Sequence, residues 1–340
     1  MTAELLVEKR AGEQSIVLEK RAVLLAPSTV AGPKESRGPL AGSFDRCYDD
    51  LVLKEKSFER AECHMLEEVC YLAIGKAGLV PNQIDYYLGG DLLNQIISAS
   101  FCARKLAIPF FGLYGACSTL AESLCLAGMM IEGGFARNIL VAVSSHNCSA
   151  ERQYRYPTEY GFQRPGYAQW TITGAGAAVI GVSGDGPRLE SLTPGKVVDA
   201  DIKDPYDMGS AMAPAAADTI YTHLNDLQRD PSYYDLIITG DLGGVGKKLN
   251  EAILERNGVR IAANYTDCGL LIYYPQQQVD AGASGCACSA LGFFGYYYPL
   301  MLKKEIRRIL LVATGALHSP TTFLQGESIP AIAHAVSLEI

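Results

Sequence analysis

The sequence lacks the features that mark proteins that bind nucleic acid or span membranes. Lysine and arginine total 29 against 37 aspartates and glutamates, a formal charge of −8, and no basic block interrupts the chain. A nucleic-acid partner is therefore not expected, because such partners require concentrated positive charge. The longest apolar stretch, Ala290 to Leu302, is shorter than the roughly 20 residues that cross a bilayer. We expect a protein that is soluble or at most peripheral to a membrane.

A secretory signal and a metal-binding cysteine pattern are also missing. Charged residues occur within the first ten positions, so no uninterrupted apolar segment begins the chain. Of the ten cysteines, Cys286 and Cys288 have a C-x-C spacing without a second pair at metal-ligand distance. Others, such as Cys70 and Cys102, lie in apolar patterns where a reduced thiol acts as a small hydrophobe. We expect a reducing compartment, no metal and no cofactor.

Glycine, in contrast, is abundant. The 340 residues include 34 glycines, grouped between apolar runs of five or six residues. Short buried strands separated by helices and tight turns are typical of an α/β protein with a mostly parallel sheet. The length allows two core-bearing halves.

Three segments of the first half recur in order in the second half, which indicates a duplication. The pairs are Ile84–Leu92 with Tyr234–Leu242 (offset 150), Gly115–Ser118 with Gly282–Gly285 (offset 167), and Arg137–Val143 with Arg307–Ala313 (offset 170). We predict halves 1–185 and 186–340, whose sheets pack face to face with helices between and outside them.

Helical periodicity occurs at corresponding places in these halves. Amphipathic helices are predicted at Glu59–Ala77 and Asp218–Leu227. A third is predicted within Leu291–Leu302, where Tyr296–Tyr298 are expected to pack internally or to contact a membrane protein.

One cysteine lies at a strand-to-helix turn. A Gly-Ala turn precedes Cys117, and Leu120, Leu124 and Ala127 have helical spacing. A helix amino terminus favours a thiolate through its free N–H groups and macrodipole, so Cys117 is the candidate nucleophile. The spacing alone also fits a small buried cysteine at a tight turn.

The Gly115–Ser118 turn and the helix after it resemble the nucleophile turn of thiolases and β-ketoacyl-acyl-carrier-protein synthases. The order of the repeats resembles that family too, over nearly the whole chain. The resemblance implies a thiolase-like fold, in which two pseudo-symmetric βαβαβαββ halves form a five-layer αβαβα arrangement. It also implies a homodimer formed through edge strands.

The catalytic set that this family places opposite the cysteine is incomplete in this chain. Ketoacyl synthases of the initiating type carry a histidine where this chain has Asp241, and an asparagine where it has Ala283. Thiolases have Gly-His-Pro before the second glycine-rich turn, where this chain has Gln278-Val-Asp-Ala. His318 alone does not restore the set. Each lost oxyanion-hole donor raises the acyl-transfer barrier by roughly 3–4 kcal/mol, so we expect a protein that is not an enzyme.

Longer segments resemble the stage V sporulation protein AD family of spore-forming Firmicutes. These segments are Gly90–Gln95, Ser144–Asn147, Ala150–Tyr160, Asp207–Thr219, Thr239–Gly246 and Glu327–Val336. That resemblance implies binding of dipicolinic acid (pyridine-2,6-dicarboxylate), free or with calcium, and a part in its uptake into the developing spore. The implied partners are membrane proteins of the same operon, and the implied location is the cytoplasmic side of the inner membrane of the forespore.

Within that resemblance, the former acyl pocket is expected to hold a planar dianion. Two carboxylates on an aromatic ring call for forked cationic donors, helix amino termini and an aromatic face. Arginines and tyrosines of this kind follow Ser144, among them Arg164, Tyr154, Tyr156 and Tyr160. The expected ligand-binding residues are Cys117, Ser118, His146, Asn147, Arg152, Arg155, Asp91, Asp241 and His318.

Plainer roles stay open for several of these residues. Arg152 and Arg155 could pair with Glu151 and Glu159 on a solvated loop. His146, at a predicted strand end, could simply cap the sheet.

The two aspartates and the thiol also have alternatives. Asp91 and Asp241 could cap turns, because bare carboxylates repel a dianion unless calcium bridges them. A residual acyltransferase or thioesterase that uses Cys117, with His146 or His318 as its base, is the competing function. A scaffold that only contacts membrane partners is the third.

Overall fold

The computed structural model describes residues 9–19, 22–155 and 163–340. Five strands of the first half share its main sheet: β3 (Val23–Ala31), β5 (Tyr86–Gly90), β6 (Phe110–Gly112), β7 (Asn138–Ser145) and β9 (Gly174–Gly181). Five follow from the second half: β10 (Arg188–Thr193), β11 (Leu236–Thr239), β12 (Tyr265–Asp267), β14 (Arg308–Ala316) and β15 (Ala331–Glu339). Short strands β1 (Arg10–Ala11), β2 (Ser15–Val17) and β4 (Arg46–Cys47) extend the sheet, and β8 (Trp170–Thr171) pairs separately with β13 (Ala283–Ser284).

The strand order is the same on the two sides of the sheet's centre. It runs β12-β11-β14-β15-β10 in one half and β6-β5-β7-β9-β3 in the other. The halves join where Arg188 of β10 lies opposite Val23 of β3. This matching order confirms the duplication that the sequence predicts. The division into two domains at residue 185 stays a prediction.

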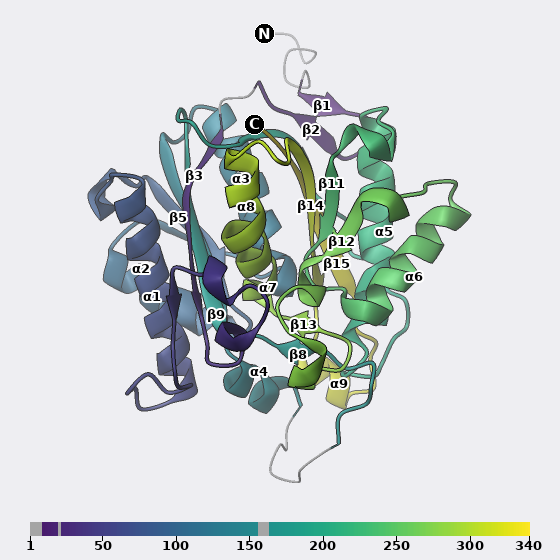
Figure 1. The fold of residues 1–340 in the computed structure, drawn as a ribbon, viewed down its shortest axis with the longest axis horizontal. Coiled ribbons are helices and arrows are strands. Elements are labelled where there is room, and N and C mark those ends of the chain that lie inside the picture. Colours follow the sequence, from purple (N-terminus) through teal and green to yellow (C-terminus); the bar gives the residue numbers. More distant parts are fainter. Residues whose placement is uncertain (1–8, 20–21, 156–162) are drawn as a thin grey trace.

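Helices form the remaining layers (Figure 1). Those on the outer faces are α1 (Phe58–Lys76) and α2 (Ile97–Leu106) over the first half, and α5 (Met208–Asp226) and α6 (Gly243–Arg256) over the second. Between the two halves of the sheet lie α3 (Thr119–Glu132), α7 (Cys286–Ala290), a π-helix (Leu291–Tyr297) and α8 (Tyr298–Leu302). The short helices α4 (Asn147–Tyr154) and α9 (Pro320–Leu324) lie at one end of the molecule. The result is the predicted five-layer αβαβα arrangement.

Two of the three predicted helices differ from the structure. The outer helix α5 begins at Met208, ten residues before the predicted start, and Asp207 caps it by accepting a hydrogen bond from Ser210 N. The segment predicted as amphipathic, Leu291–Leu302, is instead largely buried between the sheets. Its residues are apolar on all sides of the helix, which suits a central position. Within the described part of the chain, no helix is long and apolar enough to span a bilayer.

The register of the glycine-rich turns also needs correction. Ser118 N donates to Gly115 O at 3.0 Å, and Cys288 N donates in the same way to Gly285 O at 2.9 Å. Gly285, at an offset of 170, is therefore the structural equivalent of Gly115. The sequence comparison had matched Gly282, which makes an earlier turn with its own positive φ of 117°.

Each half fixes the entry to its central strand with an aspartate. In each half, one carboxylate oxygen accepts hydrogen bonds from two consecutive backbone N–H groups. Asp85 Oδ2 accepts from Arg137 N (2.6 Å) and Asn138 N (3.0 Å). Asp235 Oδ2 accepts from Arg307 N (2.7 Å) and Arg308 N (2.9 Å). The duplication is thus visible in single hydrogen bonds as well as in strand order.

Candidate functional site

A small cavity lies next to the cysteine turn, and Tyr154 at the end of α4 is part of its lining. Its volume is about 30 Å³. That is enough for roughly one water molecule and far below the roughly 300–1,000 Å³ of ordinary small-molecule sites. The lining residues are Leu92, Ala116, Cys117, Tyr154, Arg155, Thr171, Met208, Met212, Ser284, Ala316 and His318.

The cysteine turn brings Cys117 against the second half of the chain. Cys117 lies in a short 3₁₀ turn, and α3 begins two residues later at Thr119. Its sulfur lies 3.9 Å from Ser284 Oγ, which donates a hydrogen bond to Asp241 Oδ2 at 2.8 Å. Asp241 also accepts from Gly285 N (3.1 Å) and from Thr314 Oγ1 (2.7 Å). A thiol, a hydroxyl and a carboxylate therefore lie in a row.

The surroundings of Cys117 do not favour a thiolate. Burial raises its pKa well above the ordinary thiol value, and the nearby charge of Asp241 raises it further. The expectation that the helix amino terminus activates Cys117 is therefore wrong in this structure.

Arg155 and His318 supply the polar wall of the cavity. The Arg155 side chain is 5% exposed, and its Nη1 donates to Glu151 Oε1 at 2.6 Å. Neither Arg155 Nε nor the two ring nitrogens of His318 have a hydrogen-bond partner among the described residues. Buried polar atoms of native proteins are rarely left in this state. The wall therefore presents unsatisfied polar nitrogens next to the cavity.

The arginines beside this wall are paired with carboxylates. Glu151 is shared, because Arg164 Nη1 also donates to it at 3.1 Å. Arg164 Nε in addition lies 3.9 Å from Asp280 Oδ2, so two guanidinium groups face two carboxylates. The pKa of His318 is lowered to about 4, first by burial and then by the positive charge of Arg155. His318 is consequently neutral at pH 7 and offers one N–H donor and one nitrogen acceptor.

Comparison with known proteins decides the family. The family model of stage V sporulation protein AD matches residues 12–339. The stage V sporulation protein AD of Bacillus subtilis (strain 168) is 49% identical over 331 residues, which are 97% of this chain and 98% of that protein. The chain belongs to the stage V sporulation protein AD family. The family resemblance predicted from the sequence is confirmed.

Solved structures similar to this family member are condensing enzymes. The 3-oxoacyl-[acyl-carrier-protein] synthase III of Aquifex aeolicus VF5 has a TM-score of 0.59 at 14% identity, and the match covers 94% of this chain and 100% of the synthase. The tetronic acid condensing enzyme AbyA1 has a TM-score of 0.58 at 17% identity, with 94% and 100% covered. At such identities the likeness establishes the fold alone, and the predicted thiolase-like fold is confirmed.

Of the expected ligand-binding residues, Cys117, Arg155 and His318 line the cavity, and Asp241 lies behind Ser284. The structure does not bring the other five into the cavity lining. Ser118 Oγ donates to the backbone oxygen of Gly115 at 2.7 Å.

Asp91 and Arg152 have the plainer roles that the sequence left open. Asp91 accepts hydrogen bonds from Leu93 N and Ala99 N, both at 2.8 Å, and so caps the turn before α2. Arg152 pairs with Glu59 of α1, a partner that the sequence did not suggest. Glu159, with Tyr156 and Tyr160, lies outside the described residues.

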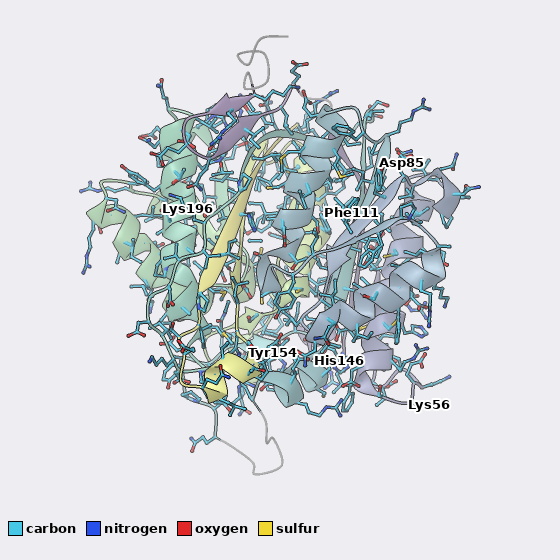
Figure 2. The ribbon with its side chains drawn as sticks, turned by 180° about the vertical axis from the view of Figure 1, so that it is seen from behind. Lys56, Asp85, Phe111, His146, Tyr154 and Lys196 are labelled. Atoms are coloured by element: carbon cyan, nitrogen blue, oxygen red, sulfur yellow. The ribbon has the colours of Figure 1, made fainter. Side chains whose placement is uncertain are left out.

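His146 and Asn147 hold the start of α4 in place. His146 Nδ1 accepts from Cys148 N at 3.2 Å, and its Nε2 is bonded to Leu51 O at 2.8 Å, so both ring nitrogens are occupied. Asn147 Nδ2 donates to Thr171 O at 3.0 Å. Figure 2 shows His146 and Tyr154 at the same end of the molecule; His146 caps the start of α4 and Tyr154 is its last residue.

Sequence reasoning missed several residues of the cavity wall. Ser284 lies in the Gly-Ala-Ser-Gly turn that the repeat had identified, so its position was detectable. Tyr154 was noticed only as one tyrosine among several, yet its ring lies 5.2 Å from that of His318, centroid to centroid. Met208 and Met212 come from the turn of α5 that the predicted helix omitted.

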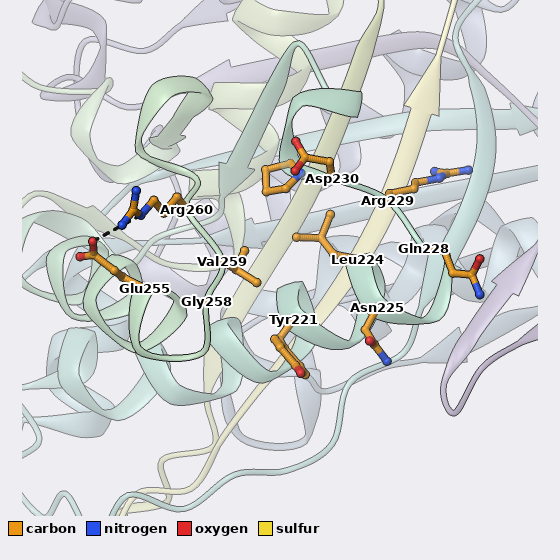
Figure 3. Close-up of a pocket in the computed structure, with 11 residues that line it drawn as sticks. Tyr221, Leu224, Asn225, Gln228, Arg229, Asp230, Glu255, Gly258, Val259 and Arg260 are labelled. Carbon is orange, nitrogen blue, oxygen red and sulfur yellow. Dashed lines mark ion pairs between the residues drawn. The ribbon is translucent and has the colours of Figure 1, made fainter.

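A larger groove of about 800 Å³ lies elsewhere, between the end of α5 and the loop after α6 (Figure 3). Its charged side chains have partners: Arg260 pairs with Glu255 at 3.7 Å, and Arg229 donates to Glu190 at 2.8 Å. No group of three or more histidines, cysteines, aspartates and glutamates within residues 9–19, 22–155 and 163–340 is arranged to hold a metal ion.

Proposed function

We propose that this member of the stage V sporulation protein AD family is a non-catalytic binding protein for dipicolinic acid, free or as its calcium complex. In this proposal it takes part in dipicolinate uptake into the developing spore, together with membrane proteins of the same operon. Its place would be the cytoplasmic side of the inner membrane of the forespore. The observation that carries the proposal is the buried wall of Arg155 and His318, where Arg155 Nε and both ring nitrogens of His318 have no partner in the described part of the chain.

A planar dicarboxylate fits the chemistry of this wall. A carboxylate would accept from the Arg155 guanidinium in charge-assisted hydrogen bonds, and His318 would donate a second. The pyridine ring would pack on the aromatic face of Tyr154. Arg155 is paired with Glu151 through Nη1, but its Nε has no partner among the described residues and so remains available as a donor to an anion.

Binding requires the cavity to enlarge, since about 30 Å³ does not admit a six-membered ring with two carboxylates. Two of the walls that would have to move are Met208 and Met212. Methionine side chains are unbranched and change shape readily, so this is the side on which we expect the cavity to open.

Acyl transfer by Cys117 is less well supported. The pKa of the thiol is raised, while that of His318, the imidazole in the same cavity, is lowered. A weak base facing a weak acid leaves both in their neutral forms at pH 7. His146, the other candidate base, has both ring nitrogens occupied.

The first prediction tests the ligand by calorimetry. Titration with dipicolinate, with and without calcium, should show saturable binding to the unaltered protein. Arg155→Ala should weaken it at least tenfold, because a charge-assisted bond to a carboxylate contributes about 1.5–3 kcal/mol. Arg152→Ala, an arginine outside the cavity lining, is the matched control and should bind normally.

Two results of the titration would contradict the prediction, and a separate result would favour acyl transfer. No heat at millimolar dipicolinate, or equal weakening by both arginine variants, would remove this pocket as the dipicolinate site. A mass increase after exposure to acetyl- or malonyl-coenzyme A, lost in Cys117→Ser, would favour acyl transfer instead.

A homodimer is part of the same proposal. Strand β6 ends the strand order on one side, and Phe111 on it is half exposed. A second copy would add its own strand beside β6, on which Figure 2 labels Phe111.

A further inference from the structure

A buried carboxylate without a cationic partner lies one hydroxyl group away from the cavity. Asp241 is 1% exposed, and its Oδ2 accepts a hydrogen bond at 2.8 Å from Ser284 Oγ, which belongs to the cavity lining. Its other side-chain hydrogen bonds come from Gly285 N and Thr314 Oγ1. None of these donors within the described part of the chain carries a positive charge. Buried carboxylates ordinarily have a cation beside them, so the charge of Asp241 is uncompensated.

A second carboxylate adds negative charge to the same region. Asp267, at the end of β12, is fully buried and accepts four hydrogen bonds, three of them from backbone N–H groups. Its pKa is raised to about 7, first by burial, and the charge of Asp241 contributes to the rise. The other titratable groups that interact with Asp241 are the thiols of Cys117, Cys268, Cys286 and Cys288, whose pKa values are all raised by burial. These thiols are neutral and compensate neither carboxylate.

Dipicolinate would bring two further negative charges to this region. The arginines beside the cavity offset them only in part, because Arg155 and Arg164 already face Glu151 and Asp280. Like charges in a buried region disfavour each other's ionised forms. Uptake of a proton would remove one of the charges that oppose the ligand.

We propose that the cavity binds dipicolinate together with one proton and that Asp241 receives this proton. The inference rests on the proposed function, since it concerns the same cavity and the same ligand. The proton comes from solvent and joins Asp241 Oδ2, and no bond of the ligand forms or breaks. The new O–H group then donates to Ser284 Oγ, and the Ser284 hydroxyl turns to donate to a carboxylate of the ligand. A hydroxyl group can reverse in this way because it holds one donor and two acceptor lone pairs.

Asp241 is a positioning residue in this scheme, because it acts through Ser284 and does not contact the ligand. While Asp241 is ionised, the Ser284 proton points at Asp241 Oδ2. Ser284 then offers only acceptor lone pairs to the cavity, and these repel a carboxylate. Protonation of Asp241 converts Ser284 into a donor, in addition to those of Arg155 and His318.

His318 is the other group of the lining that could receive the proton. Its pKa is lowered first by burial and then by the positive charge of Arg155, so a second positive charge is disfavoured there. Asp241 has a neighbour of the opposite kind, since a carboxylate at Asp267 disfavours the ionised form of Asp241. Burial also raises the pKa of Asp241. Protonation of Asp241 therefore removes a repulsion between like charges, whereas protonation of His318 creates one.

Calorimetry of the full-length protein with calcium-free dipicolinate tests this inference. Titrations at pH 7.5 in PIPES and in Tris, two buffers with different enthalpies of ionisation, give the number of protons taken up on binding. We expect about one proton for the unaltered protein and none for Asp241→Asn, whose amide resembles the protonated acid. Glu62→Gln is the matched control, because Glu62 is a buried carboxyl group outside the cavity lining, and it should still take up about one proton.

The pH dependence of the affinity gives a second readout. Between pH 7 and 8, the Kd of the unaltered protein should rise about tenfold, because one proton is bound with each ligand. The Kd of Asp241→Asn should stay constant over this range. Dipicolinate itself remains ionised, since carboxyl groups ordinarily titrate near pH 4.

Thr314→Val provides a second variant that leaves Asp241 in place. It removes the hydrogen bond that Thr314 Oγ1 donates to Asp241 Oδ1 at 2.7 Å, at a residue outside the cavity lining. A hydrogen bond of this kind favours the carboxylate, so its loss should raise the pKa of Asp241 in the free protein. The pH above which the Kd begins to rise should therefore be higher in Thr314→Val than in the unaltered protein.

Several results would overturn the inference and leave dipicolinate binding intact. These are binding without proton uptake, uptake that persists in Asp241→Asn, an equal loss of uptake in Glu62→Gln, and an unchanged pH profile in Thr314→Val. Asp241→Asn that folds without binding would also overturn it, because a neutral amide should bind at least as tightly at pH 8. If only the calcium complex binds, this inference fails and the proposed function stands. If neither form of dipicolinate binds, the proposed function fails as well.

Discussion

A single buried glutamate, Glu62, is kept in its neutral form by its surroundings in the core. Glu62 of α1 is fully buried, with hydrogen bonds from Ser144 Oγ and Ser149 Oγ, each at 3.0 Å. Its pKa is raised to about 8, first by burial and then by the negative charge of Asp91. Asp91 accepts hydrogen bonds from two backbone N–H groups, which stabilise its carboxylate. Of the two acidic groups, Asp91 is therefore the one that is ionised more readily. At neutral pH, Glu62 is therefore protonated in the folded chain.

This protonation predicts a pH-dependent stability. The pKa of Glu62 is higher in the folded chain than in the unfolded chain, so the stabilisation is complete at low pH and is lost as the pH rises through about 8. The free energy of unfolding should fall, relative to that of Glu62→Gln, by up to about 1.4 kcal/mol per pH unit between pH 5 and 8. Urea unfolding at pH 5, 6.5, 8 and 9.5 measures the difference.

Glu255→Gln, at an exposed glutamate, controls for the substitution itself. A difference between Glu62→Gln and the unaltered protein that stays constant from pH 5 to 9.5 would mean that the glutamate is already ionised in the folded state. That result would contradict the assigned protonation.

At the scale of elements, the sequence predicts the bounds of those helices whose periodicity and caps are local. Helix α1 lies within one residue of its predicted bounds, because its apolar face and its Ser57 cap are both local signals. The π-helix at Leu291–Tyr297 was not predictable in the same way, since its environment is set by two sheets that are distant in sequence. The same limit applies to the cavity: Arg155 was foreseen as a charged residue, but its burial and its unsatisfied Nε depend on tertiary packing.

The paired aspartates offer a test of the duplication at this scale. Asp85→Ala and Asp235→Ala should each lower the free energy of unfolding by about 1–3 kcal/mol, because each leaves two backbone N–H groups without their acceptor. The costs should add in the double variant, since the two anchors share no partner. Chemical denaturation of the three variants measures this.

Asparagine substitutions at the same two positions keep one acceptor oxygen and should cost less. If one aspartate proved indispensable while the other could be removed freely, the two halves would not depend on equivalent anchors.

At the scale of the whole molecule, the halves interlock by exchanging contacts at their glycine-rich turns. A Cβ on Gly285 of the second half would lie 2.8 Å from Ser145 Oγ of β7 in the first. The reciprocal contact joins Gly315 of β14 to the cysteine turn, where a Cβ on Gly315 would overlap the backbone oxygen of Gly115. The corrected offset of 170 relates Gly285 to Gly115 and Gly315 to Ser145. In each half, the end of the central strand therefore packs against the glycine-rich turn of the other half.

This interlock predicts that Gly315→Ala disturbs the two halves together. The added methyl group meets backbone atoms of Gly115 and Ser118, which cannot rotate aside as a side chain would. We expect a loss of at least the 1–3 kcal/mol that overpacking ordinarily costs, seen as a lower midpoint of thermal unfolding. Gly42→Ala, where a Cβ would have no neighbour within 4 Å, is the matched control and should unfold like the original protein. Because the cysteine turn forms one wall of the cavity, the Gly315 variant should also lose the proposed dipicolinate binding under conditions where it is still folded. If the two glycine variants unfolded at the same temperature, the contact between Gly315 and the cysteine turn would not hold the halves together. The second half would then not support the shape of the cavity through this contact.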